Sequence, residues 1–225
     1  MKHPMLVKTY CLRSDRAVRA APPPCGDTLL YRVLRHIPTD SVTAEQAGTA
    51  MAPGAEHIGA VLECTFADAG EQARAVDTPA WRAFEAALHA SEELLFALDS
   101  AANVPIAPRG AARDGGFRRW MLLKRAAPAA DAFRDAWFGR HAQLVSRLPG
   151  VDGYCQHLVA ARFDARLAPV PHEALQVDGI AALCFADEAA MLASYASPAR
   201  VPLRDDGLAL LAGNVTLLVQ GERLA

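Results

Sequence analysis

Residues 57–81 (HIGAVLECTFADAGEQARAVDTPAW) and residues 176–200 (QVDGIAALCFADEAAMLASYASPAR) decide the fold, because the two stretches carry the same pattern. Two matches stand at one constant offset with no gap between them: Phe66-Ala67-Asp68 with Phe185-Ala186-Asp187, and Thr78-Pro79-Ala80 with Ser197-Pro198-Ala199. Weaker matches before and after them follow in the same order. The sequence therefore predicts an internal duplication.

A stretch rich in proline and glycine separates the two copies. Residues 105–116 (PIAPRGAARDGG) contain two prolines and three glycines and show neither helical nor strand periodicity. We expect a first repeat at 1–104, a linker at 105–116 and a second repeat at 117–225. The basic run at 109–119 is interpreted as a solvated tether.

The second repeat has the element order βαββαβ. Strands are expected at 117–125, 154–163, 180–185 and 215–220, with helices at 130–148 and 187–196. This order is typical of a ferredoxin-like sheet with helices on one face.

The first repeat keeps the same order of strands. They are expected at 5–11, 28–37, 58–66 and 93–99, with helices at 68–76 and 79–90. The connection at 12–27 is short and contains three consecutive prolines, so we expect this repeat to lack its first helix. The predicted fold class is α+β, with two ferredoxin-like repeats.

Composition excludes several classes of function. The chain has 225 residues, of which 52% are hydrophobic and 21% charged, and its net charge of −2 offers no basic field for nucleic acid or an acidic membrane. Its N-terminus becomes charged again after a few apolar residues, unlike a signal peptide, and its five cysteines are scattered. We expect a cytoplasmic protein with reduced thiols, acting as a monomer with an internal pseudo-dimer or as a homodimer.

Motifs for cofactors and metals are missing from the sequence. It has no glycine-rich dinucleotide loop, no P-loop and no GxSxG elbow, and its seven histidines lack metal-ligand spacings. We therefore expect no cofactor and no metal.

His141 is the first candidate for chemistry. It shares one stripe of the helix expected at 130–148 with Phe133, Trp137, Leu144 and Leu148, and such a stripe faces the sheet. A histidine with a pKa near 6.5 can give or take a proton at working pH. The alternative is a core histidine bonded to a backbone carbonyl.

Four further residues are candidates. Tyr154 could orient a carbonyl or enolate oxygen, or it could be a packing aromatic. His157, on the opposite face of the same strand, could be a second base. Glu63 and Cys64 are weaker candidates, since buried cysteines usually behave as small hydrophobes. The expected pocket lining is Trp120, Leu122, Phe133, Trp137, Leu144 and Ile180.

The second half resembles the EthD family of the dimeric α+β barrel superfamily. The resemblance rests on Lys124-Arg125, the helix pattern Phe133-x3-Trp137-x3-His141-Ala142-x-Leu144-Val145, Leu148-Pro149-Gly150-Val151-x2-Tyr154, Asp178-Gly179-Ile180-Ala181, and Phe185-x-Asp187 with Ser197-Pro198. It covers most of 117–222, and in the first half only about 57–99. Family members pair two ferredoxin-like units sheet to sheet, so the resemblance implies a fused pair in which the two repeats pack as an internal dimeric α+β barrel.

The resemblance also implies chemistry. The family includes proteins linked to ether degradation and catalogued with oxidoreductases, and similar folds include lactone isomerases, polyketide cyclases and small monooxygenases. In the methylmuconolactone isomerase branch a helix histidine matches His141, and a Glu-Cys pair matches Glu63-Cys64. The second half has Ala182 and Leu183 instead of that pair, so neither half carries the whole set.

Two functions remain open from the sequence. The first is a small cofactor-independent enzyme of isomerase, cyclase, lyase or oxidoreductase type, acting by proton transfer on a hydrophobic carbonyl or lactone compound in the degradation of organic compounds. The second is a non-catalytic protein that binds a small ligand or has an auxiliary role. An open cavity that reaches His141 would favour the enzyme.

Overall fold

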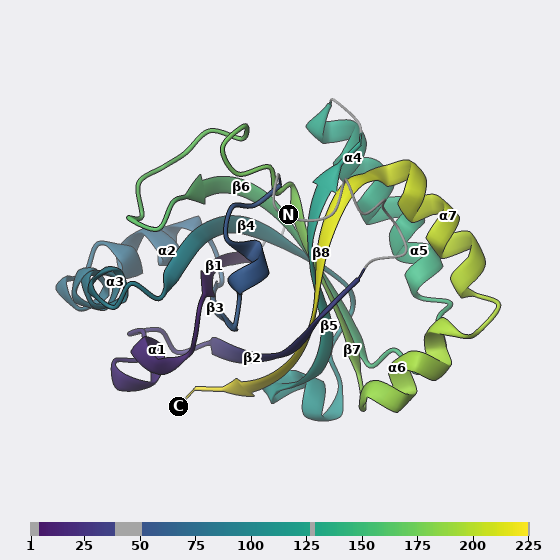
Figure 1. The fold of residues 1–225 in the computed structure, drawn as a ribbon, viewed down its shortest axis with the longest axis horizontal. Coiled ribbons are helices and arrows are strands. Elements are labelled where there is room, and N and C mark those ends of the chain that lie inside the picture. The colour runs from purple at the N-terminus through teal and green to yellow at the C-terminus, as the bar shows by residue number, and fades with distance from the viewer. Residues whose placement is uncertain (1–4, 39–50, 127–128, 225) are drawn as a thin grey trace.

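The computed structural model describes residues 5–38, 51–126 and 129–224 (Figure 1). Eight strands close into one barrel in the order β1-β3-β2-β8-β5-β7-β6-β4, and every neighbouring pair is antiparallel. The strands are β1 (Leu6–Leu12), β2 (Thr28–Ile37), β3 (Ala60–Phe66), β4 (Leu94–Ile106), β5 (Gly115–Arg125), β6 (Gly153–Phe163), β7 (Gly179–Phe185) and β8 (Leu211–Arg223). The fold is therefore α+β with an antiparallel barrel.

Each half of the chain supplies one side of the barrel. The first half contributes the run β4-β1-β3-β2, and the second half contributes β8-β5-β7-β6. The two runs meet at two seams, where β2 pairs with β8 and β4 pairs with β6. Side chains from both halves therefore share one barrel interior.

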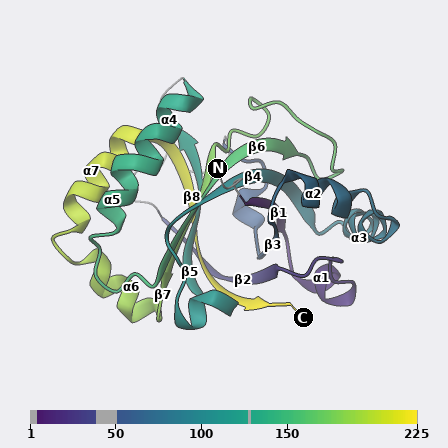
Figure 2. The same ribbon diagram turned by 180° about the vertical axis from the view of Figure 1, so that it is seen from behind.

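Helices cover the outside of the barrel on two opposite sides, as Figures 1 and 2 show from front and back. The first-half helices are α1 (Arg16–Ala20), α2 (Ala69–Val76) and α3 (Pro79–Ala90). The second-half helices are α4 (Ala130–Ala136), a π-helical turn η3 (Trp137–His141), α5 (Ala142–Val145), α6 (Glu188–Tyr195) and α7 (Arg200–Leu210). Two short 3₁₀ turns, η1 (Ala55–His57) and η2 (Gly110–Asp114), lie in the connections.

The repeated Phe-Ala-Asp pattern has a structural cause. The phenylalanine ends a strand in both halves, and the aspartate two residues later caps the next helix. Asp68 accepts a hydrogen bond from the backbone N–H of Glu71, and Asp187 accepts one from that of Ala190. An aspartate in this position satisfies a helix N–H group that would otherwise lack a partner.

Both faces of most strands are apolar because both faces are covered. Alternate side chains point into the barrel, where they form a core that includes Tyr31, Val61, Phe96, Trp120, Leu122, Ile180 and Leu217. The others point outward beneath the helices, in one cluster around Trp81 and Phe84 and another around Phe133 and Trp137. A one-residue change of register would exchange the two faces.

Several sequence expectations need correction. The first half does have a helix between β1 and β2, but α1 is a single turn because the prolines follow it. The linker is shorter than expected, since β4 extends to Ile106 and β5 begins at Gly115. The end of the expected tether is strand, and the side chains of Arg118 and Arg119 are buried rather than solvated.

The helix α7 (Arg200–Leu210) was not predicted at all. Pro202 and Gly207 hide its pattern, although a proline in the first turn of a helix displaces no internal hydrogen bond. In the described part of the chain, no helix has the length and apolar character needed to cross a bilayer.

Candidate functional site

A small cavity lies between the outer face of the second-half sheet and the helices that cover it. Its volume is about 60 Å³. Its lining residues are Arg119, Met121, Leu123, Trp137, His141, Val145, Tyr154, Ala181, Leu183, Tyr195, Arg200, Leu203, Gly207, Leu210, Leu211 and Asn214. Apolar walls with a few polar groups are typical of small-molecule sites.

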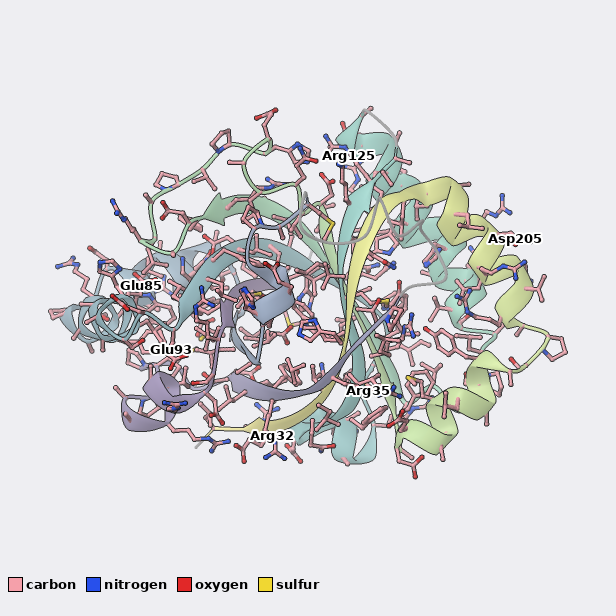
Figure 3. All side chains as sticks on the ribbon, viewed as in Figure 1. Arg32, Arg35, Glu85, Glu93, Arg125 and Asp205 are labelled. Atoms are coloured by element: carbon pink, nitrogen blue, oxygen red, sulfur yellow. The ribbon has the colours of Figure 1, made fainter. Side chains whose placement is uncertain are left out.

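His141 belongs to this wall and is paired with a carboxylate. Its Nδ1 lies 2.8 Å from Oδ2 of Asp206 on α7, and the two side chains are only 14% and 13% exposed. Arg140 Nε lies 3.1 Å from the other carboxylate oxygen of Asp206. Asp205 is on the outer side of the same helix, as Figure 3 shows, so Asp206 is the member of the acidic pair that faces inward.

The pair fixes the chemical state of the imidazole. Burial lowers the pKa of His141, and the hydrogen bond and charge of Asp206 only partly offset that effect. A neutral imidazole that donates its Nδ1 proton to Asp206 leaves Nε2 as the acceptor. Among the described residues, none is hydrogen-bonded to Nε2. This arrangement is suited to accept a proton from a compound in the cavity.

A hydrogen-bonded network supports the same wall from the sheet. Gln156 Nε2 on β6 donates to the carbonyl oxygen of Trp137 (2.8 Å) and to the hydroxyl oxygen of Tyr154 (3.0 Å). Asn103 Nδ2 on β4 in turn donates to Gln156 Oε1 at 2.7 Å. Burial raises the pKa of Tyr154, so its hydroxyl keeps its proton and can donate it. The network joins the π-helical turn to both halves of the barrel.

Close packing sets the position of Trp137. A Cβ atom on Gly179 would lie 2.6 Å from the Trp137 ring, so the residue facing that ring on β7 must be a glycine. Phe133 stacks on Trp137, with ring centroids 5.2 Å apart. The indole is therefore held rigidly between the sheet and α4.

The structure divides the predicted pocket residues into two groups. His141, Tyr154 and Trp137 line the cavity, and Phe133 and Leu144 belong to the same apolar cluster behind it. The placement of Trp120, Leu122 and Ile180 in this pocket is wrong, because their side chains point into the barrel. Their neighbours along each strand face the helices instead, as alternation requires.

His157 and Glu63 lie elsewhere, at one mouth of the barrel. There a second cavity of about 200 Å³ is lined by Glu63, His157, Arg118 and Cys155, among other residues. Glu63 Oε1 accepts a hydrogen bond from Trp120 Nε1 (3.0 Å) and lies 3.9 Å from His157 Nδ1. His157 is therefore not part of the site that contains His141.

Glu63 and Cys64 are separated by the same alternation. Cys64 faces α3 on the outside of the barrel, where a hydrogen bond with Cys25 and burial raise the pKa of its thiol. A thiol with a raised pKa is a poor nucleophile. In the described residues no group of three or more His, Cys, Asp or Glu side chains is arranged to hold a metal ion.

Arg119, Arg200 and Asn214 line the cavity and were not predicted, and neither was Asp206, which is paired with His141. The signal for Arg119 was present in the sequence, because an arginine within an apolar strand is a buried charge. Asn214 and Asp206 had no comparable signal, since the first lies just before the predicted start of β8 and the second lies on the helix that was missed.

Residues 129–207 match the family model of the EthD domain. This part of the chain is similar to the EthD domain family. The matched region spans α4, the π-helical turn, β6, β7 and most of α7, and it includes both His141 and Asp206. The resemblance noted in the sequence is therefore confirmed.

Several solved structures share the fold over nearly the full chain. A proposed monooxygenase from Fusobacterium nucleatum superposes with a TM-score of 0.58 at 9% identity, covering 99% of this chain and 96% of its own. One from Lactobacillus acidophilus gives a TM-score of 0.53 at 9% identity, covering 97% and 94%. An anthrone oxidase-like protein gives a TM-score of 0.53 at 12% identity, covering 99% and 94%.

At such identities the likeness is one of fold. No curated protein matches the sequence.

Proposed function

We propose that this EthD-domain protein is a small enzyme in which His141 transfers a proton on a hydrophobic carbonyl or lactone compound, without a cofactor. The observation that carries the proposal is the hydrogen bond between His141 Nδ1 and Asp206 at the wall of a cavity. A neutral histidine oriented by a carboxylate is a common general base.

The proposed step is an isomerisation. Nε2 of His141 takes a proton from the carbon next to the carbonyl, and the electron pair of the broken C–H bond forms an enolate. Asp206 stabilises the resulting imidazolium, and the hydroxyl of Tyr154 hydrogen-bonds to the enolate oxygen. In a compound with a C=C bond next to that carbon, the electron pair extends over it as a dienolate. The imidazolium returns the proton to the far carbon of that system, which moves the double bond and restores the neutral base.

The proposal extends to the architecture. Each half places its strands in the order fourth-first-third-second, which is the order of a ferredoxin-like unit. We interpret the chain as two such units fused into an internal pseudo-dimer that needs no second copy to close its barrel. In this view the second unit carries the reaction and the first supplies the other wall of the barrel.

Exchange of carbon-bound hydrogen in D₂O tests the proposal without knowledge of the true substrate. A panel of small cyclic ketones and γ-lactones is incubated with the protein, and loss of the α-proton signal is followed by NMR. We expect exchange by the wild type and a loss of about 10²-fold or more in His141→Gln, with the exposed His89→Gln as control. Equal exchange by His141→Gln would show that His141 is not the base.

The same assay separates the alternative of a non-catalytic binding protein. A compound that shifts the NMR signals of the protein but never exchanges its own protons would support binding alone.

A further inference from the structure

Arg119 has an unusual position for a charged side chain. It projects from β5 toward the helices, is only 7% exposed, and lines the same cavity as His141. Its guanidinium carbon lies 4.7 Å from the centroid of the Tyr195 ring. No hydrogen bond and no ion pair joins Arg119 to any other described residue, and its buried Nε lacks a partner.

The preceding residue provides an internal comparison. Arg118 is 3% exposed, but its Nε donates to the Gly115 carbonyl (3.0 Å) and its Nη2 to the Ala112 carbonyl (2.8 Å). Its guanidinium also lies over the Tyr31 ring. The charge of Arg118 is therefore compensated inside the barrel.

The buried Lys8 gives a second comparison. It is 6% exposed, and its Nζ lies 3.5 Å from Asp99 and 3.7 Å from Glu85. Among these three buried cations, only Arg119 lacks a carboxylate or carbonyl oxygen as partner. Because a guanidinium cannot give up its proton in a protein, Arg119 keeps its charge at an energetic cost unless an anion binds.

The cavity is built to receive such an anion. Its described lining includes Arg119 and no acidic residue, since Asp206 lies behind His141 and is shared with Arg140. The Oδ1 atom of Asn214 is also buried there without a donor. A compound with an anionic group and a polar N–H or O–H would pair with the Arg119 guanidinium and with Asn214 Oδ1, which the protein leaves without partners.

We infer that Arg119 binds the carboxylate of a small, otherwise apolar organic acid, which the cavity presents to His141. A carboxylate matches the planar fork of a guanidinium and forms two parallel hydrogen bonds with it. A phosphate would demand more donors than this small, largely apolar cavity offers. The role of His141 in this inference rests on the proposed function, whereas the binding by Arg119 does not.

Paired carboxylates and amides test the inference. Sodium acetate and sodium benzoate are compared with acetamide and benzamide, with sodium chloride keeping the ionic strength constant, and binding is followed by thermal unfolding and tryptophan fluorescence. We expect the wild type to respond to at least one carboxylate and not to its amide. In Arg119→Met we expect the apparent affinity for that carboxylate to fall roughly tenfold to hundredfold.

Stability provides a second, independent readout. Without ligand, Arg119→Met should unfold at the same temperature as the wild type or higher, because it removes an uncompensated buried charge. The matched variant Arg118→Met should unfold at a lower temperature, because it leaves two buried carbonyl groups without donors.

The outcomes are distinct. An equal response to carboxylate and amide, a response to inorganic phosphate alone, or an unchanged carboxylate affinity in Arg119→Met would each overturn the inference. A protein that binds benzoate through Arg119 but shows no His141-dependent exchange would retain the anion site and lose only the proposed reaction.

Discussion

Adjacent residues on a strand of this barrel lie in different chemical environments. Arg118 points into the barrel and Arg119 toward the helices, and Glu63 and Cys64 are separated in the same way. A pair of neighbouring polar residues in the sequence therefore says little about a shared site. Residues that are far apart in sequence, such as His141 and Asp206, form the pair that matters.

Asp206→Asn tests the pair at the level of one atom. The charge and hydrogen bond of Asp206 raise the pKa of His141 against the effect of burial, so the variant should lower that pKa further. NMR titration of the His141 ring protons measures the shift. We expect exchange activity to fall about tenfold or more, because the imidazolium loses its stabilising partner. An unchanged pKa would contradict the role given to Asp206.

Gly179→Ala tests the packing that positions Trp137. The added methyl group would overlap the buried indole, so we expect a loss of about 1–3 kcal/mol of unfolding free energy and a changed cavity. Denaturant unfolding and tryptophan fluorescence measure the two effects. Gly139→Ala is the matched control, since a Cβ there meets no atom within 4 Å. Equal stability of the two variants would contradict this account.

At the scale of elements, the π-helical turn depends on a strand for its support. Gln156 is fully buried and joins the Trp137 carbonyl of the turn to Asn103 on β4. Such turns disturb the regular helical hydrogen bonds and are frequent at functional sites. The turn ends at His141, so Gln156 also helps to place the proposed base.

Gln156→Leu should therefore destabilise the protein by about 2 kcal/mol, because it leaves buried polar groups without partners. Chemical denaturation measures this loss, and the same variant should reduce His141-dependent exchange. The exposed Gln220→Leu is the control and should change stability by less than about 0.5 kcal/mol. A similar small effect in Gln156→Leu would show that the turn needs no support from the sheet.

The sequence predicted the elements that have strong local signals. The strand at Thr28–Ile37 and the helix at Pro79–Ala90 were placed at their observed bounds, because periodicity and capping residues mark them. It failed for α7, whose proline and glycine resemble loop signals. From the sequence, Trp120 was also placed in the His141 pocket. The strand alone does not show which of its two faces points into the barrel, because that depends on how the barrel closes.

At the scale of the whole molecule, neither half can bury its own inner sheet face. Separated fragments 1–106 and 107–225 would each expose two unpaired strand edges and the apolar interior that the closed barrel covers. We expect each fragment to self-associate or to remain unfolded, and the mixture to recover an assembly with the mass of the intact chain. Size-exclusion chromatography with light scattering measures this. A stable folded monomer of either fragment would contradict the shared core.

Two buried histidines, one in each cavity, make the stability of the whole molecule depend on pH. Burial lowers the pKa of both His141 and His157 below the ordinary value of 6.5. Below that pH the unfolded chain takes up protons that the folded chain does not, so the free energy of unfolding should fall as the pH falls. Each histidine adds up to about 1.4 kcal/mol per pH unit, until the pH passes its folded pKa.

Denaturant unfolding at a series of pH values from roughly 7.5 to 5 measures this slope for the wild type and three variants. His141→Gln and His157→Gln should each reduce the slope by the contribution of one histidine. Because the carboxyl groups contribute equally to the slopes of the variant and the wild type, subtracting one slope from the other removes their contribution. The exposed His89→Gln should keep the wild-type slope. If His141→Gln also kept it, burial would not lower the pKa of His141. If His141→Gln made the slope steeper, the pKa would instead be raised in the folded protein, and a protonated imidazole could not be the base that accepts a proton from a compound in the cavity.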